Sequence, residues 1–330
     1  MMDPAGYVID DHLAHEPLRA LGWRVDWVPW NREGVDWCAY DVAVIRSTWD
    51  YQLQPDAFLA VLAGIEQRGV RLENGLELVR WNSSKTYLRD LAALGVPTAP
   101  SVWREELRRG DLPVLFDEVA SDEIVIKPVV SANAMGTWRL DRTTARARAS
   151  ELESFFAGRP FIVQPMARAI LGEGEYSLFY FNGAFSHAIL KTPKAGDFRV
   201  QEEHGGVIRA VKASRALRDA GAATLKAVGD APLYARADFV RSNAKANANA
   251  AGARGDAYWL MELELIEPAL YLRMDAGAPT RFARALDARM ADGQAASVAP
   301  QSPQNRAPGS VTAAPQAPHS PVRKRPQSEQ

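Results

Sequence analysis

Two segments in the last third of the chain, LYARADFV (233–240) and AYWLMELEL (257–265), alternate between two kinds of side chain with a period of two. In a β-strand, successive side chains point to opposite faces. The alternation therefore places Glu262 and Glu264 on one face, and a hairpin of the two strands would bring Asp238 onto the same face. The sequence predicts a sheet with three converging carboxylates.

Such carboxylates repel one another unless something neutralises them. With no His or Cys nearby, their oxygens suit a hard cation, which favours Mg²⁺ (or Mn²⁺) over zinc. The single cysteine, Cys38, also excludes an intramolecular disulfide framework and a multi-cysteine zinc site. Taken alone, the acidic pattern leaves a second interpretation open, a solvated strand face paired with Lys and Arg.

The composition excludes several classes of protein. The 330 residues are 47% hydrophobic, enough for two or three lobes with their own cores. A formal net charge of -1 gives no positive field for nucleic acid, so no nucleic-acid partner is expected. No apolar run has the length of a membrane span, the start does not resemble a signal peptide, and a reducing cytoplasm suits the lone cysteine. We expect a cytoplasmic protein with no membrane partner.

Residues 1–80 alternate helix-like and strand-like segments and predict an N-terminal α/β lobe with a parallel sheet. WRVDWVPW and YDVAVIRS are the expected strands, and PDAFLAVLAGIEQRG is an amphipathic helix that ends at Gly69. The chain opens almost directly on a helix, whereas such a lobe normally begins with a strand. The sequence therefore indicates a truncated or misassigned start, with the first strand missing.

Residues 81–165 predict a second unit. A helix capped by Asn82 or Ser83 and ending at Gly95 precedes a short buried strand, EIVIKPVV. Beyond the strand we expect a flexible SANAMG loop, the strand TWRL, one helix over TTARARASELESFFAG and the strand FIVQPM.

Residues 166–290 predict a third unit, which begins with a hairpin turned by Asn182-Gly183 in EYSLFYFNGAFSHAILK. A helix over RALRDAGAATLKAVG separates this hairpin from the acidic strands. The low-complexity segment between those strands, RSNAKANANAAGARGD, predicts a disordered loop. From residue 291 to 330, Pro, Gln, Ala and Ser dominate, which predicts a disordered tail.

Two lysines are suited to bind phosphate. Lys127 stands at the end of the buried strand IVIKP, where a lysine without a partner is rare. The loop that follows, from Ser131 to Gly136, is small enough to let backbone N–H groups approach phosphate oxygens. Lys85, at the start of a helix, is equally consistent with an ordinary surface lysine.

The ordered set of segments resembles the ATP-grasp enzymes. The segments are NSSKTYLRDLAALGVPTAP, IVIKPVVSANAMG, FIVQPM, EYSLFYFNGAFSHAILK, GDFRVQEEHGG, ARADFV and MELELIEP. The resemblance spans roughly residues 7 to 285 and points to the glutathione synthetase branch. Within that branch, the chain most resembles the O-ureido-serine cyclo-ligase type of cycloserine biosynthesis. It implies an α/β and α+β fold, in which an N-terminal parallel α/β lobe precedes two α+β lobes that clasp ATP.

The resemblance also implies roles for individual residues. Those expected to bind ATP are Lys85, Lys127, the loop Ser131–Gly136, Gln164, Pro165 and Met166, with either Glu173 or Glu175 at the ribose. The implied Mg²⁺ ligands are Asp238, Glu262 and Glu264, the last of which is often Asn in glutathione synthetases. Residues expected near the transferred phosphate and the acyl group are Arg199, with Arg236 a weaker candidate, and Gly205 and Gly206.

In this branch the segment RSTWDY (46–51) resembles a substrate-facing loop, which would include Ser47 and Thr48. Arg46 would clamp a carboxylate bidentately, and Asp50 would receive an amine. An aromatic-rich loop that stabilises a lobe interface is the alternative interpretation.

The function implied is an ATP-dependent ligase that joins a carboxylate to an amine through an acylphosphate-type intermediate on an amino-acid-like small molecule. Lys127 and Arg199 would offset the charge that develops on the moving phosphoryl group. The alternatives are a small-molecule kinase and a non-catalytic ATP-binding module. The sequence leaves open the acid, the amine, the cyclic or linear nature of the product, and the homodimer that is common in the family.

Overall fold

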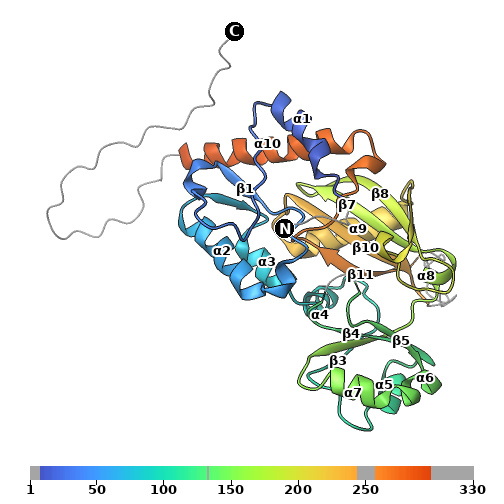
Figure 1. Ribbon diagram of the computed structural model, residues 1–330. Coiled ribbons are helices and arrows are strands. Elements are labelled where there is room, and N and C mark those ends of the chain that lie inside the picture. Colours follow the sequence, from blue (N-terminus) through green and yellow to red (C-terminus); the bar gives the residue numbers. More distant parts are fainter. Residues whose placement is uncertain (1–7, 132–133, 244–256, 299–330) are drawn as a thin grey trace, which may run out of the picture.

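The structure is a computed structural model that describes residues 8–131, 134–243 and 257–298. Figure 1 shows three parts, each built on its own sheet. A small parallel sheet lies on the left, a large antiparallel sheet on the right, and a four-stranded sheet below the large one. No helix among the described residues is long and apolar enough to cross a membrane.

The N-terminal lobe contains the expected parallel sheet. Strand β1 (Val42–Val44) pairs with β2 (Arg71–Glu73), and helix α2 (Pro55–Gln67) connects them. Pro55 occupies the first turn of α2, where its missing N–H costs nothing, and a stripe of Phe58, Leu62 and Ile65 is buried against the sheet. Short 3₁₀ turns at Trp37–Ala39 and Tyr51–Leu53 and helix α3 (Leu76–Asn82) complete this lobe.

The predicted strand WRVDWVPW is wrong, because residues 23–30 form no strand. Their indole groups are held by side chains instead. Trp23 Nε1 donates to Asp287 at 3.1 Å, Trp27 Nε1 lies 2.8 Å from the His15 ring, and Trp30 Nε1 donates to Asp50 at 2.9 Å.

The large sheet has the strand order β11-β10-β7-β8-β9, with every neighbouring pair antiparallel. Its strands are β7 (Glu175–Phe181), β8 (Ala184–Thr192), β9 (Val207–Ala210), β10 (Tyr234–Arg241) and β11 (Tyr258–Glu264). The Asn182-Gly183 turn is confirmed, since both residues have the positive φ values, 48° and 75°, that a tight hairpin needs. The prediction of paired acidic strands is also confirmed by the β10–β11 ladder.

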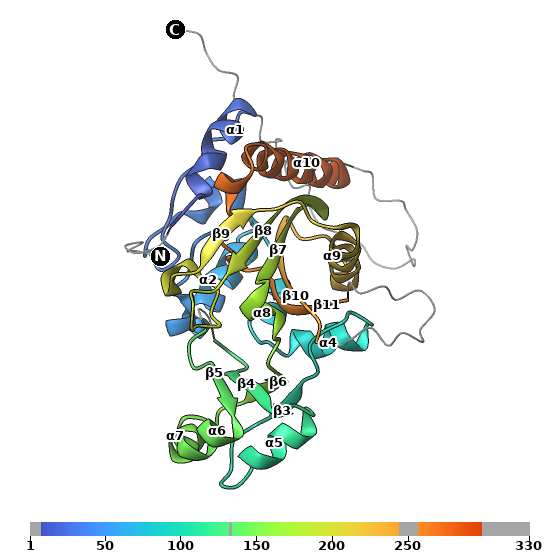
Figure 2. The same ribbon diagram turned by 90° about the vertical axis from the view of Figure 1, so that its right-hand side faces the viewer.

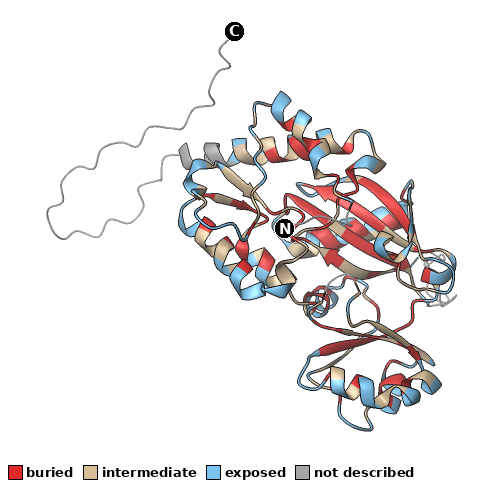
Figure 3. Cartoon of the chain, viewed as in Figure 1, coloured by how far each residue is buried: buried red, intermediate tan, exposed pale blue. Residues whose placement is uncertain are grey.

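Helices cover both faces of this sheet (Figure 2). Helix α9 (Arg215–Val228) and helix α4 (Tyr87–Ala93) pack on the face that carries Ala235, Ala237 and Phe239. On the opposite face, helices α1 (His15–Ala20) and α10 (Ala278–Val298) cover one half only. Figure 3 shows β7, β8 and β10 buried along much of their length, which makes them the centre of the large sheet.

The central lobe is a four-stranded antiparallel sheet with the order β3-β6-β4-β5. Its elements are β3 (Val102–Arg104), α5 (Leu112–Glu118), β4 (Glu123–Pro128), β5 (Trp138–Asp141), α6 (Arg142–Ala147), α7 (Ala149–Phe155) and β6 (Phe161–Pro165). The single helix expected over residues 143–158 is wrong, because the helix is interrupted at Arg148 and forms α6 and α7. The core of the lobe comes from residues 107–163.

Two of the expected lobe boundaries do not coincide with the limits of the hydrophobic cores. The central lobe expected over residues 81–165 includes residues 87–96, yet Tyr87, Leu88 and Leu91 pack into the core of the large sheet. The boundary at residue 290 falls inside α10, which continues to Val298. The predicted disordered loop (241–256) begins inside β10, because Arg241 pairs with Tyr258, and its residues 244–256 lie outside the described residues, as does the tail from residue 299. The remaining short elements are 3₁₀ turns at Asp11–Ala14, Glu202–His204 and Leu272–Met274 and helix α8 (Ala169–Gly172).

Candidate active site

A cavity of about 230 Å³ lies where the three lobes meet. Its wall includes most of the charged residues that the sequence singled out, together with aromatic residues of the N-terminal lobe. The charged residues in the wall are Lys85, Lys127, Glu175, Lys191, Arg199, Glu202, Glu203, Arg236, Glu262, Glu264 and Glu267.

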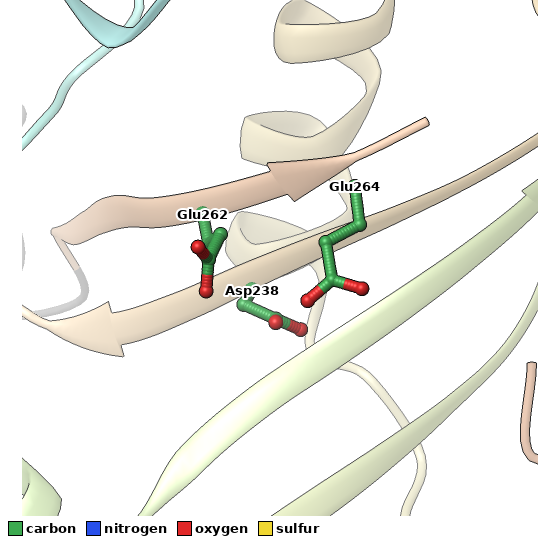
Figure 4. A group of neighbouring side chains, drawn as sticks. All are labelled: Asp238, Glu262 and Glu264. Atoms are coloured by element: carbon green, nitrogen blue, oxygen red, sulfur yellow. The ribbon is translucent and has the colours of Figure 1, made fainter. Parts of the chain in front are cut away.

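The three predicted metal ligands converge on one face of the sheet (Figure 4). Asp238 on β10 is directly opposite Glu262 on β11, and Glu264 lies two residues further along β11. One carboxylate oxygen from each lies within 4.8 Å of the others. The alternation in the sequence therefore predicted this cluster correctly.

Basic side chains surround the cluster. Lys191 on β8 is 3.2 Å from Asp238 and 2.5 Å from Glu175, Arg236 is 3.0 Å from Asp238 and also pairs with Glu264, and Lys85 is 3.3 Å from Glu262. Burial works against an ionised Asp238, but Arg236 and Lys191 lower its pKa below the usual range. Burial, together with the neighbouring Glu262, raises the pKa of Glu264 despite its contact with Arg236.

The donor set fits a divalent hard cation. Two oxygens bound to one Mg²⁺ at about 2.1 Å lie at most about 4.2 Å apart, close to the spread of this cluster. Burial is the main reason why the pKa of Glu264 is raised, and the neighbouring Glu262 and Asp238 add to the rise. A Mg²⁺ ion held by Asp238, Glu262 and Glu264 would add positive charge to this cluster.

Lys127 faces the same cluster from the central lobe. Burial lowers the pKa of its ammonium group, and Glu262 opposes that shift. Lys127 forms no ion pair within the described part of the chain. Lys85 Nζ donates to the Ser131 carbonyl at 2.7 Å, which connects the predicted phosphate loop to Glu262. Both lysines line the cavity, and Lys85 is buried and paired with Glu262, unlike the surface lysine of the alternative interpretation.

Part of the loop after β4, residues 132–133, lies outside the described residues. Ser131 and Ala134 line the cavity, whereas Gly136 does not. A Cβ on Gly136 would lie 2.7 Å from the Phe155 ring, so this glycine permits close packing within the lobe.

The other end of the cavity offers an apolar slot of the kind that a nucleobase needs. Val125, Met166, Ile170 and Met261 line it, next to Gln164 and Pro165. The Gln164 amide donates to Ser101 at 3.0 Å, and its Oε1 has no hydrogen-bond partner.

Of the two candidate ribose ligands, Glu175 lines the cavity and Glu173 does not. Glu173 pairs with Arg241 at 2.8 Å and accepts a hydrogen bond from the Tyr176 hydroxyl. The cavity therefore favours Glu175.

Arg199 enters the cavity from the loop after β8. Asp197 orients it through contacts of 2.7 Å to Nη2 and 3.1 Å to Nε. Gly205 and Gly206 close this loop but do not line the cavity. A Cβ on Gly206 would lie 2.0 Å from the Val200 carbonyl oxygen, so Gly206 allows the backbone to turn there.

The RSTWDY segment supports in part both interpretations, a substrate-facing loop and a loop that stabilises a lobe interface. Arg46 pairs with Asp11 at 2.9 Å and donates to the Pro268 carbonyl at 2.5 Å, while Ser47 donates to Asp11. The Arg46 contact with Pro268 stabilises the interface with the large-sheet part, whereas the Asp50–Trp30 hydrogen bond lies within the N-terminal lobe. Thr48 is buried with its hydroxyl unpartnered and does not line the cavity. Trp49 and Tyr51 do line it, so this segment reaches the cavity through its aromatic residues.

Sequence reasoning missed two groups at this site. Lys191 lies inside the apolar strand AFSHAILK, and the argument applied to Lys127 would have found it. Asn82, expected as a helix cap, instead bonds the backbone of β11, with its Nδ2 2.9 Å from the Leu263 carbonyl and its Oδ1 2.9 Å from the Leu265 nitrogen. Helix α4 begins after Thr86 without a side-chain cap, so the predicted capping role of Asn82 or Ser83 is wrong.

A cavity between two α+β lobes, which Lys127 reaches from the central lobe and the carboxylate cluster reaches from the large sheet, is the arrangement of an ATP-grasp ligase. The solved structures agree. The crystal structure of the D-cycloserine synthetase DcsG superposes with a TM-score of 0.72 at 29% identity, covering 85% of this chain and 95% of that one. The ATP-grasp ligase PsnB (TM-score 0.58, 18% identity, 87% and 97% covered) and the D-alanine–D-alanine ligase of Bacillus anthracis (0.54, 15%, 79% and 82%) share the fold.

Sequence comparison gives the family. The model described as "D-cycloserine synthetase DcsG, N-terminal domain" matches residues 2–74. The cycloserine biosynthesis protein DcsG of Streptomyces lavendulae is 31% identical over 295 residues, which cover 83% of this chain and 92% of that protein. The chain belongs to the DcsG family of ATP-grasp ligases. It is therefore an ATP-dependent enzyme that forms C–N bonds.

Proposed function

We propose that the enzyme activates the carboxyl group of an amino-acid-like small molecule with ATP and Mg²⁺ and then joins that carbonyl carbon to a nitrogen nucleophile. The observation that carries this proposal is the cavity that Lys127 of the central lobe shares with Glu262 and Glu264 of the large sheet, whose carboxylates cluster with that of the buried Asp238. Kinship with DcsG, a D-cycloserine synthetase, makes ureido amino acids the first substrates to test.

In this proposal the basic residues position ATP. Lys85 and Lys127 bind its phosphates, and the slot at Gln164, Pro165 and Met166 takes the adenine. Of the two carboxylates considered for the ribose, Glu175 is the one that we propose. Asp238, Glu262 and Glu264 would hold Mg²⁺, and the ion would neutralise part of the phosphate charge.

The chemistry follows from positioning and charge. Lys127 and Arg199 offset the charge that develops as the γ-phosphoryl group moves to a substrate carboxylate oxygen, which gives an acylphosphate and ADP. The nitrogen nucleophile then attacks the carbonyl carbon, the C–O bond to phosphate breaks, and the nitrogen loses a proton. No Ser, Cys or His nucleophile is needed, because the protein holds the reacting groups together.

A Mg²⁺-dependent ADP-release assay over amino acids and ureido amino acids tests the proposal, with the products identified by mass spectrometry. Asp238→Asn is expected to lower kcat/KM by at least roughly 100-fold, since one charged metal ligand is lost. Asp230→Asn, an exposed residue outside the cavity, is the matched control. A phosphorylated substrate released without a new C–N bond, or full activity in Asp238→Asn, would contradict the proposal. The homodimer remains a prediction that light scattering can test.

A further inference from the structure

Glu267 stands apart from the other acidic residues in the cavity wall. It follows β11 by three residues and lines the cavity on the side of the N-terminal lobe. Trp49 of that lobe donates its indole N–H to the Glu267 carbonyl at 2.8 Å, which fixes the backbone at this point. Glu267 is thus positioned by two lobes at once.

The other partly buried acids of the wall have basic partners. Glu175 pairs with Lys191, Glu262 with Lys85, Glu264 with Arg236 and Glu202 with Arg273. Glu203, the remaining acid of the wall, is exposed to solvent.

Glu267 forms no ion pair within the ranges that the structure describes. The two arginines whose charges lower the pKa of Glu267 are already engaged, Arg46 with Asp11 and Arg236 with Asp238 and Glu264. Burial, with a further contribution from Glu264, raises the pKa of Glu267 to about 8. A carboxylate in such surroundings is stabilised by a cation, and the described residues supply none in contact with it.

Glu267 lies away from the residues that we propose to bind the phosphates of ATP. Along β11 and its exit the acids follow in the order Glu262, Glu264, Glu267, and Lys127 is beside the first of them. Tyr51 and Trp49 line the same cavity, and among the acids Glu267 acts most strongly on the Tyr51 hydroxyl. An aromatic wall beside a carboxylate is well suited to an organic ammonium group, through charge and through the ring faces.

We propose that Glu267, with Trp49 and Tyr51, binds the protonated amino group of the substrate and so selects amino acids over the corresponding simple carboxylic acids. This inference rests on the proposed function and specifies its substrate class. It assigns the amine-binding role to Glu267 in place of Asp50, whose carboxylate accepts the Trp30 indole and does not line the cavity. It places the amino group on the opposite side of the metal ligands from Lys127.

The test compares two probes that differ only in the amino group, O-ureidoserine in each enantiomer and its desamino analogue, 3-(ureidooxy)propionate. Their dissociation constants are measured by calorimetry on the full chain with Mg²⁺ and ADP present. The wild-type protein is expected to bind one enantiomer of the amino probe roughly tenfold or more tightly than the desamino probe. Glu267→Gln is expected to abolish this preference, Glu267→Asp to retain part of it, and the exposed Glu105→Gln to leave it unchanged.

A preference that persists in Glu267→Gln, or no preference in the wild-type protein, overturns the inference. The ADP affinity is measured in the same titrations and shows that each variant is folded. ADP binding without a role for Glu267 contradicts this inference alone, whereas failure of every form to bind Mg²⁺ and ADP contradicts the proposed function itself.

Discussion

The side chain of Asn82 donates a hydrogen bond to the Leu263 carbonyl and accepts one from the Leu265 N–H. Leu263 and Leu265 are the residues before and after Glu264, so Asn82 holds the backbone on both sides of Glu264. β11 is the edge strand of the large sheet, so these backbone groups have no neighbouring strand on that side. Asn82 takes the place of such a strand, and the Tyr87 hydroxyl accepts from the Leu263 N–H at 3.0 Å. The end of α3 thereby fixes the orientation of a predicted metal ligand.

Replacing Asn82 with Ala is expected to lower the free energy of unfolding by about 2–5 kcal/mol, since two buried backbone groups each lose a partner. Urea denaturation measures this change, and the exposed Asn31→Ala is the control. If both variants unfold at the same urea concentration, Asn82 does not support β11.

Replacing Lys127 with Met is expected to weaken ATP binding roughly 10- to 100-fold, because one charge-assisted contact to phosphate is lost. Stability is not expected to fall, since a half-buried ammonium group that forms no ion pair with the described residues is removed. Because burial lowers the pKa of Lys127 below its usual value of 10.5, ATP affinity should also decline as the pH rises towards that value. Calorimetry of ATP binding measures both effects, with the exposed Lys226→Met as control.

His187 is expected to make the fold sensitive to acid. Its Nε2 bonds the Leu270 carbonyl at 3.1 Å, its ring stacks on Phe179, and burial lowers its pKa to about 4 from an ordinary value of 6.5. The unfolded chain binds the proton more readily, so this contribution to stability is complete above pH 6.5 and is lost as the pH falls towards 4.

Between pH 7.5 and pH 5 the loss from His187 amounts to about 2 kcal/mol. Urea denaturation at the two pH values should show a smaller difference in His187→Gln than in the wild-type protein. The exposed His12→Gln should keep the full difference, and an unchanged difference in His187→Gln would refute the assignment.

Gly206→Ala should lower kcat/KM roughly tenfold or more, because the new methyl group would collide with the Val200 carbonyl and displace the loop that carries Arg199. ADP release measures the loss. Gly172→Ala, with nothing within 4 Å of the added carbon, is the matched control. Equal activity in the two variants would show that Gly206 is not needed to position Arg199.

The elements that the sequence predicted well are those with local signals. The Asn-Gly turn and the alternation around Asp238 depend on residues close together in the chain, and both the hairpin and the carboxylate cluster appear in the structure. The strand expected at residues 23–30 failed because its tryptophans make contacts with distant residues such as Asp287, which no local pattern records.

The chemical types at the site were readable from the sequence, because strand periodicity alone puts Asp238, Glu262 and Glu264 on one face. Their partners were decided by tertiary structure. Lys191 reaches Asp238 across the β7 strand that separates β8 from β10, and Glu267 has no basic partner among the described residues because Arg46 and Arg236 pair elsewhere. Side-chain direction along a strand is a local property, whereas the balance of buried charge depends on every lobe that meets at the cavity.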